Sequence, residues 1–375
     1  MKRAIVVASA TVGLAAGLLA GAPAQAVTGY DPDAAGHAGF TITPPSAAYV
    51  MAFHTCNGDC DNPTNHLIHL AQSADGATWT ELSGWQPYPG SVPDAFRRAN
   101  TIYVIGHGVS KVDVASGAVT AHALNIKKAD GSKAMARDTS FAGQLADGRL
   151  VIVYVPSMQD VAGASEIPVM TAVEDAGSDG TAFTTTGQAI SIPKASLGIG
   201  EPTDPDVFFN GSTWVLYVSV GANVVSYTGP APGGPFSLDT ASRVSTNSGG
   251  VPSGIAAGGA VWTYVNQGGR DQVSIRRAVT ATGTAPIPDG AFTIVLTGAQ
   301  VGSATAESPG IAANVPGIAC GAGCAPTSSS TSSTAPSKKQ PRPGASCSKA
   351  GATGVVGATK LVCKKQKGKL VWVRR

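Results

Sequence analysis

The sequence lacks the periodic pattern of helices. After residue 26, no stretch keeps apolar residues at the 3.6-residue spacing of an amphipathic helix. This absence argues against α/β barrels and doubly wound sheets, which place a helix between successive strands. A Gly-rich phosphate loop, a nucleophile elbow and a metalloprotease helix motif are also missing, so these three chemistries have no support in the sequence.

Long apolar runs are scarce as well, and the most prominent one lies at the start of the chain. The run from Ala4 to Ala20 follows Met1-Lys2-Arg3 and is followed by Ala24-Gln25-Ala26. A basic start, a short Ala/Gly-rich apolar stretch and an A-x-A site are typical of a secretory signal peptide rather than of a membrane anchor. We therefore predict a signal peptide over residues 1–26, a mature protein that begins at Val27, and secretion.

Charged residues make up only 13% of the chain and are unevenly distributed. Eleven of the 26 Lys and Arg residues follow Pro326, where no acid occurs, and two lie in the signal peptide. The body then has 13 basic against 23 acidic residues, a net charge of about −10 that the overall +3 conceals. A basic tail can simply favour solubility, but we expect it to hold the protein at the anionic cell envelope. Nucleic acid is not an expected partner of an exported chain.

A module of roughly 45 to 50 residues recurs along the middle of the chain. Its copies alternate apolar and polar residues, as in Thr213 to Val218, and are rich in the β-branched and aromatic residues of strands. Asp147-Gly148, Asn210-Gly211 and Gly258-Gly259 supply tight hairpin turns. Repetition with strand content alone predicts an all-β, five-bladed β-propeller. The predicted domain spans residues 27–325, with blades at about 46–82, 92–124, 138–192, 203–240 and 249–297.

The first copy is the least regular. Its strands, 47–53 and 66–71, are followed by Ser73-Ala74-Asp75-Gly76-Ala77-Thr78-Trp79, which resembles the Asp-box hairpin of sialidases and other propellers in a form one residue shorter. Ser178 to Phe183 is similar to a degenerate second copy. In such a turn the carboxylate caps backbone N–H groups, Gly takes a positive φ and Trp packs between sheets. The motif supports the fold and indicates no chemistry.

The composition changes abruptly after the propeller. Residues 326–345 are rich in Ser, Thr and Pro and are expected to form a disordered linker. Residues 346–375 form a small basic module similar to those at the termini of secreted actinobacterial proteins. About thirty residues bury too little surface to fold unaided, so we expect a disulfide between Cys347 and Cys363.

Four further cysteines occur as two Cys-x3-Cys pairs, Cys56 with Cys60 and Cys320 with Cys324. A zinc site built from the four thiolates is one interpretation, and His54, His66 and Asp59 lie near the first pair in the sequence. An even cysteine count in an exported chain favours disulfides. The pairs either close two local loops or join the first blade to the segment after the last; we favour local loops.

Chemistry in a propeller is expected at the central channel, where the innermost strand of each blade begins. Carboxylates occur near the start of three successive copies: Asp94, Asp138, Glu201, Asp204 and Asp206. Here the chain resembles the five-bladed glycoside hydrolases of the arabinanase and β-xylosidase type. The stretch Thr203 to Ser219, TDPDVFFNGSTWVLYVS, is similar to the Asp-Pro-x-Val blade opening of that group.

The resemblance implies roles for four residues. Asp94 would be the general base, Asp138 would tune the acid, and Glu201 or Asp204 would donate the proton. Inverting hydrolysis needs two carboxyl groups about 6.5–9.5 Å apart with room for a water molecule. Each Asp beside a Pro is also a common turn cap, so a purely structural role is the alternative for any one of them.

The resemblance also implies that Arg97 and Asp206 contact the substrate. It requires no cofactor, although a structural calcium ion in the central channel is compatible with it. We expect a monomer whose partner is a polysaccharide or other glycan. Two classes of function remain open: an exported enzyme that cleaves glycans, and a surface propeller that binds glycan or protein without cleaving it.

Overall fold

A computed structural model describes residues 33–34, 36–196, 201–269, 272–314, 349–356, 359–366 and 368–374. The chain divides into two compact units, residues 1–326 and 327–375. The predicted signal peptide, the linker, and Cys320, Cys324 and Cys347 lie outside the described residues. No helix in the described part is long and apolar enough to cross a membrane.

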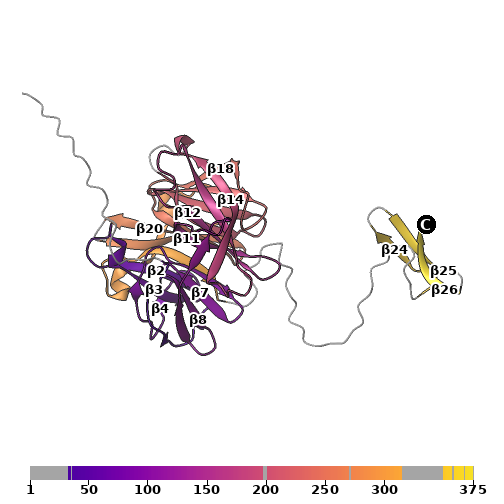
Figure 1. Ribbon diagram of the computed structural model, residues 1–375, viewed down its shortest axis with the longest axis horizontal. Helices are drawn as coiled ribbons and strands as arrows, with labels where there is room; N and C mark the ends of the chain where they lie inside the picture. The colour runs from indigo at the N-terminus through magenta and orange to yellow at the C-terminus, as the bar shows by residue number, and fades with distance from the viewer. Residues whose placement is uncertain are drawn as a thin grey trace, which may run out of the picture. The chain divides into compact units, whose positions relative to one another are not determined.

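Five antiparallel meanders form the first unit and confirm the predicted five-bladed propeller (Figure 1). In each blade the first strand named is the innermost. Blade 1 contains β23 (Glu307–Ala313), β2 (Tyr49–Cys56), β3 (His66–Ser73) and β4 (Thr80–Glu81), with β5 (Tyr88–Pro89) also on β3. Blade 2 contains β6 (Asp94–Arg98), β7 (Thr101–Ile105), β8 (Val109–Asp113), β9 (Ala118–His122) and β1 (Phe40–Thr41).

The other three blades follow in chain order. Blade 3 contains β11 (Ala136–Gln144), β12 (Leu150–Pro156), β13 (Glu166–Glu174), β14 (Ala182–Pro193) and β10 (Asn125–Lys127). Blade 4 contains β15 (Thr203–Phe209), β16 (Trp214–Val220), β17 (Asn223–Gly229) and β18 (Ser237–Ser245). Blade 5 contains β19 (Gly250–Ala257), β20 (Ala260–Gly269), β21 (Gln272–Thr280) and β22 (Thr293–Thr297).

The innermost strand of blade 1 is not the one that the sequence predicted. We expected the strand at residues 47–53 to open this blade, but β2 is its second strand, and β23 from the end of the propeller lies inside it. Tyr49 pairs with Ala313 and His54 with Glu307 in this closure. A repeat search follows contiguous sequence, and this blade is assembled from the two ends of the domain.

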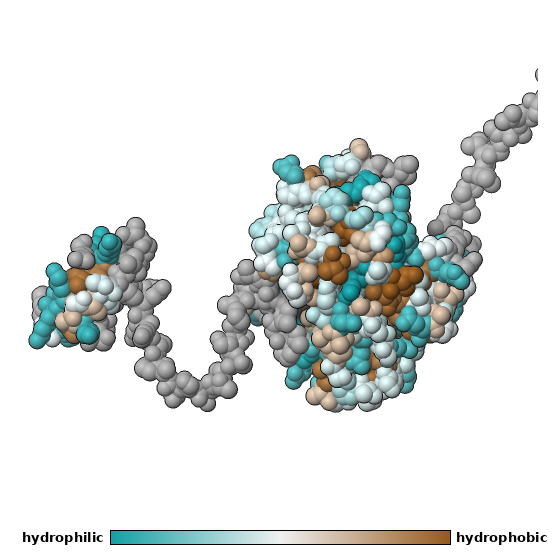
Figure 2. Space-filling model, turned by 180° about the vertical axis from the view of Figure 1, so that it is seen from behind, coloured by the Kyte–Doolittle hydropathy of each residue, from teal (hydrophilic) through white to brown (hydrophobic). Residues whose placement is uncertain are grey.

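Apolar side chains fill the space between neighbouring blades. All seven residues of β16 are buried, because the blades on either side cover both faces of its sheet. Such a strand is a continuous apolar run instead of an alternating one. Large apolar side chains that remain exposed are few, such as Ile294 and Met158. On the face shown in Figure 2 the apolar residues lie in separate patches among polar ones.

Three tyrosines on second strands join their blade to the following blade. The hydroxyl of Tyr264 donates to the carbonyl of Gly76 (2.7 Å), that of Tyr103 to the Asp179 carboxylate (2.6 Å) and that of Tyr217 to the carbonyl of Gly283 (2.5 Å). Each acceptor lies in the turn between the third and fourth strands of the next blade. The repeated contact fixes the angle between successive blades.

The turn around Gly76 shows why these contacts need glycine. Gly76 has a φ of +67°, and a Cβ added there would lie 2.6 Å from the Tyr264 hydroxyl. Asp75 Oδ1 caps this turn by accepting the N–H groups of Ala77 (2.8 Å) and Thr78 (2.9 Å). Trp79 is buried and donates its indole N–H to the Gly76 carbonyl (3.1 Å).

The second unit is a three-stranded antiparallel sheet. It consists of β24 (Thr353–Val356), β25 (Thr359–Gln366) and β26 (Lys369–Arg374). Leu361 and Cys363 are its buried side chains among those described, and Cys363 is disulfide-bonded. The cysteine therefore contributes to the small core that the sequence predicted would need a disulfide.

Candidate functional site

All five innermost strands begin with the same backbone irregularity. One residue near each start has a positive φ, and these five residues are called the bulge positions: Val92 (46°), Asp138 (50°), Asp204 (48°), Val251 (47°) and Ser308 (54°). In blades 1, 3, 4 and 5 the register with the second strand shifts at this point. The shift is a β-bulge, in which one strand holds an extra residue.

Proline follows the bulge position in four blades, and Thr139 takes its place in blade 3. Proline fits there because a bulged residue has no ladder hydrogen bond to lose. Positive φ is strained for a β-branched residue such as Val92 or Val251. Because the same strain occurs in all five blades, it belongs to the architecture and does not mark a catalytic site.

Two residues after each bulge position lies a second equivalent set, here called the latch positions: Asp94, Ser140, Asp206, Ser253 and Gly310. Asp94 Oδ2 accepts hydrogen bonds from the Ser140 hydroxyl (2.8 Å) and the Phe141 N–H (2.7 Å) of the next blade. Its Oδ1 accepts from the Ala95 N–H (2.8 Å).

The latch of blade 4 repeats this pattern. Asp206 accepts from the Ser253 hydroxyl (3.2 Å) and the Gly254 N–H (2.9 Å), and Ser253 Oγ in turn accepts from the Ile311 N–H (3.3 Å). Burial raises the pKa of Asp94 to about 6 despite its hydrogen bonds. Burial, and then the charge of Asp94, raise the pKa of Asp206. These carboxyls join blades.

Asp138 and Asp204, at bulge positions of neighbouring blades, form a different pair. The Asp204 N–H lies 3.5 Å from Asp138 Oδ2, and Thr203 Oγ donates to Asp204 Oδ2 (2.6 Å). Burial and the nearby charge of Asp138 raise the pKa of Asp204 to about 7. Burial also raises the pKa of Asp138, against the opposing effect of the Arg137 guanidinium. Asp204 is therefore poised to carry a proton near neutral pH.

The two sets surround a small cavity at the mouth of the channel. Its volume is about 20 Å³, and residues from all five innermost strands line it, including the four carboxylates Asp94, Asp138, Asp204 and Asp206. A cavity of this size holds about one water molecule. The predicted channel carboxylates thus converge, except for Glu201. A sugar ring would have to approach them from outside the mouth.

Two predicted site residues lie elsewhere. Glu201, in the segment before β15, is ion-paired with Lys194 (2.7 Å) and does not line the mouth cavity. Arg97 lies at the opposite end of the channel, where its Nε donates to the Ala99 carbonyl (3.0 Å) and its guanidinium also bonds to Asn314. Asn314 follows β23, so Arg97 fixes the closing strand.

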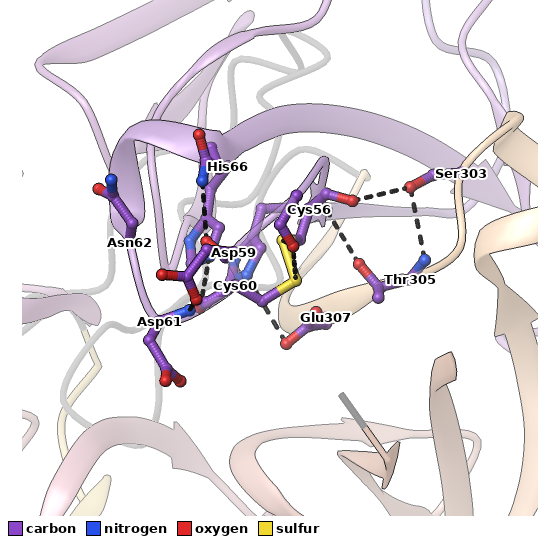
Figure 3. Close-up of a disulfide and its surroundings, with 12 residues drawn as sticks. Cys56, Asp59, Cys60, Asp61, Asn62, His66, Ser303, Thr305 and Glu307 are labelled. Carbon is purple, nitrogen blue, oxygen red and sulfur yellow. Dashed lines mark hydrogen bonds and ion pairs between the residues drawn. A yellow bond between two sulfur atoms is a disulfide. The ribbon is translucent and has the colours of Figure 1, made fainter. Parts of the chain in front are cut away.

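Cys56 and Cys60 form a disulfide, which confirms the local loop and removes the zinc alternative for this pair (Figure 3). The Cys56 N–H donates to Thr305 Oγ (2.9 Å), 249 residues further along the chain.

Close to this disulfide, the Val92 N–H donates to Nδ1 of His54. The proton of the neutral imidazole is therefore on Nε2, which lies 3.9 Å from the Glu307 carboxylate. Within the described part of the chain, no group of three or more His, Cys, Asp or Glu residues could hold a metal ion.

The innermost strand of blade 1, β23, was not predicted from the sequence, and neither were Glu307, Ser308 and Gly310 as channel residues. A signal was present. Ser308-Pro309-Gly310 repeats the spacing of Val92-Pro93-Asp94, Asp204-Pro205-Asp206 and Val251-Pro252-Ser253. Aligning the copies on this proline would have identified β23 as an innermost strand.

No protein-family model and no curated protein matches the chain. Among solved structures it is similar to a GH43_1 enzyme from Xanthomonas citri complexed with xylotriose, at 16% identity and a TM-score of 0.48 over 67% of this chain and 91% of that one. It is similar to CoXyl43, a GH43 β-xylosidase/α-arabinofuranosidase from a compost microbial metagenome, at 15% identity and a TM-score of 0.46 over 66% of this chain and 95% of that one. An endo-1,5-α-L-arabinanase from Thermotoga petrophila matches at 15% identity and a TM-score of 0.39 over 51% and 52% of the two chains. The five-bladed propeller is established by the sheet topology of the chain's own structure, and these solved structures are what it is similar to.

Proposed function

We propose that this propeller acts on a polysaccharide or other glycan at the mouth of its channel, as an inverting glycoside hydrolase. In this proposal Asp204 donates the proton, and Asp138 sets the pKa of Asp204. The substrate lies over the mouth, because the cavity beneath has a volume of only about 20 Å³.

One observation carries the proposal: the fold does not require acids at these two bulge positions. Val92, Val251 and Ser308 occupy the equivalent positions of the other blades with the same positive φ. The two carboxyls lie side by side at the mouth with their pKa values raised. Burying charge without a structural need is costly and is typical of functional sites.

The chemistry follows from these protonation states. Protonated Asp204 would donate its proton to the glycosidic oxygen as the bond from the anomeric carbon to that oxygen breaks. A water molecule would attack the anomeric carbon from the opposite face and give a proton to a carboxylate. Asp94 is the candidate base, because it lines the same one-water cavity as Asp204. A carboxylate retains acceptor capacity beyond the three hydrogen bonds that Asp94 makes.

The second candidate function is glycan binding without cleavage. It is favoured by the same three hydrogen bonds, which make Asp94 part of the joint between blades 2 and 3. Such a base would be held rigidly and shielded from substrate. The two candidate functions differ in whether any glycosidic bond is broken.

We propose further that the protein is exported and retained at the cell surface by its basic tail. The eleven cations after Pro326, without an acid, support this placement. Deleting residues 326–375 should release the protein into the medium, and the retention of the full chain should weaken with salt because exposed charges are screened. Equal retention of the shortened chain would contradict the tether.

The activity is tested on arabinan, xylan and galactan oligosaccharides, with NMR detection of the anomer first released. Cleavage with inversion is expected. Asp138→Asn should shift the alkaline limit of activity to lower pH, because Asp204 then loses the neighbouring charge that raises its pKa. Binding of an oligosaccharide with no cleavage of any of them would establish the second function instead.

A further inference from the structure

A second, larger cavity occupies the other end of the channel. Its volume is about 230 Å³, and all five innermost strands contribute to its lining. Most of the wall is apolar and much of it aromatic, and its bulky apolar side chains include Phe96, Phe141, Phe208, Phe209, Trp214 and Ile255. The cavity reaches Arg97 and Ala313 at the ends of their strands, beside the hairpin turn at Gly211.

Two carboxyl groups line the inner end of this apolar cavity. Asp94 and Asp206 border both the mouth cavity and the large one, so they lie between the two. They are only 6% and 7% exposed. Each oxygen of Asp206 accepts one hydrogen bond from the next blade, and a carboxylate oxygen can accept two. Acceptor capacity therefore remains at this end of the cavity.

No cation in the described lining of this cavity is available to balance these acids. Arg97 is the one basic residue that lines it, and its guanidinium and Nε are committed to Asn314 and to the Ala99 carbonyl. Asp94 and Asp206 lie in blades 2 and 4, and the charge of Asp94 adds to the rise that burial gives to the pKa of Asp206. The two acids therefore interact across the channel without a counter-ion.

We propose that this cavity binds a small organic cation, with an ammonium group at Asp94 and Asp206 and an apolar body among the aromatic side chains. Aromatic faces attract cations, and a carboxylate gives the ammonium group a direct partner. A cavity of about 150 Å³ holds benzene, so about 230 Å³ suits a benzylamine-sized molecule. The apolar cavity is distinct from the mouth at which glycan is proposed to act; Asp94 and Asp206 border both, but the cation proposal does not rest on the proposed function.

Calorimetry on the full chain tests this with three probes of one size: benzylamine, the neutral benzyl alcohol and the anionic benzoate. At pH 7.5 benzylamine should bind at least about tenfold more tightly than benzyl alcohol, because its ammonium group gains a carboxylate partner and cation–π contacts. Benzoate should not bind. Equal affinity for the amine and the alcohol, or no binding of the amine, would overturn the proposal.

Two substitutions locate the site. Ile255→Trp fills the cavity and should abolish benzylamine binding, whereas the matched Ile294→Trp, on a side chain that is 62% exposed, should leave it unchanged. Asp206→Asn should remove the preference for amine over alcohol. If that variant does not fold, the wild type at pH 5 tests the same acids, because their protonation should weaken amine binding at least several-fold. Amine binding that survives Ile255→Trp would place the ligand elsewhere and sink the proposal.

The mouth serves as an internal control. Asp204→Asn should leave benzylamine binding unchanged, and Ile255→Trp should leave any glycan cleavage unchanged. A wild type that binds benzylamine but cleaves no glycan would contradict only the proposed function, and a wild type that cleaves glycan but does not bind benzylamine would contradict only the cation site.

Discussion

The two pairs of channel carboxylates differ in whether the fold needs them. Asp94 and Asp206 hold the next blade through a hydroxyl and a backbone N–H, and Ser253 does a similar task in blade 5. Asp138 and Asp204 stand where other blades have Val or Ser. Comparison of the five innermost strands thus distinguishes Asp94 and Asp206, which join neighbouring blades, from Asp138 and Asp204, which the fold does not require.

The comparison also shows that strain and burial alone do not identify a site. All five bulge positions have positive φ, and all four acids line the mouth cavity. What separates the pairs is their hydrogen-bond partners. Each latch acid accepts from both a hydroxyl and a backbone N–H of the next blade, whereas Asp138 has the Asp204 N–H at 3.5 Å and Asp204 accepts from Thr203 of its own strand. Mutations should therefore divide the four acids into two classes.

The largest effect is expected at Asp204. Asp204→Asn removes the proposed proton donor and should lower glycan turnover by about 10²–10⁴-fold, the usual contribution of a general acid. Its melting temperature should not fall, because Asn carries no charge that the half-buried site would have to accommodate. Turnover and thermal unfolding of the same preparation check both claims. Full activity of Asp204→Asn would remove this residue from the mechanism.

Asp94→Ala should have the next largest effect, and on stability. The substitution leaves the Ser140 hydroxyl and the Phe141 N–H without their acceptor, which costs about 1–3 kcal/mol of the free energy of unfolding. Asp138→Ala is the matched control and should cost clearly less, because it leaves no next-blade hydroxyl without its acceptor. Equal losses of the free energy of unfolding, measured with urea, would contradict the distinction between latch and bulge acids.

The pH dependence of stability should follow the raised pKa values. The pKa of Asp204 is about 7 in the native state, against about 3.9 unfolded, so the folded protein favours the protonated form. That stabilisation is complete below the unfolded pKa and is lost as the pH rises through 7. The melting temperature should therefore fall between pH 5 and pH 8, and less steeply in Asp204→Asn. A melting temperature that rises over this range would contradict the assignment.

The smallest effect concerns the strained valines. Val251 has a φ of +47°, which Asn tolerates better, so Val251→Asn should raise the free energy of unfolding by up to about 1 kcal/mol. Val279→Asn is the control, since Val279 is exposed in strand β21. It should be neutral or slightly destabilising because Asn is a poor strand former. Destabilisation by Val251→Asn would show that the bulge needs the valine side chain.

Local sequence signals accounted for most of the fold. Turn residues such as Asp147-Gly148 and stretches rich in β-branched and aromatic residues such as Thr213 to Val218 predicted the hairpins, and counting copies predicted five blades. The strand at Trp214–Val220 is a continuous buried run and not the alternating pattern that was expected. The origin of β23 was not local, because the strand pairs with β2 from the other end of the domain. No hairpin connects them, so only the shared proline spacing pointed to it.

The site was predictable to a similar degree. The positions of Asp94, Asp138, Asp204 and Asp206 at the starts of inner strands followed from the repeat, and the structure brings all four to one cavity. Which of them hold blades together depends on donors some 46 to 48 residues away in the next blade, beyond any local pattern. The ion pair of Glu201 with Lys194 and the contacts of Arg97 with Asn314 depend on loop geometry in the same way.

The closing strand has a consequence for synthesis. Blade 1 begins with residues made early, yet β2 lacks its inner neighbour until residues 307–313 exist. Until then β2 exposes unpaired N–H and C=O groups, the kind of strand edge at which chains associate wrongly. The nascent chain is therefore exposed to wrong association during nearly the whole of its synthesis. Any truncation before residue 313 produces an open ring. Moving β23 to the front of the gene by circular permutation would let blade 1 complete itself first.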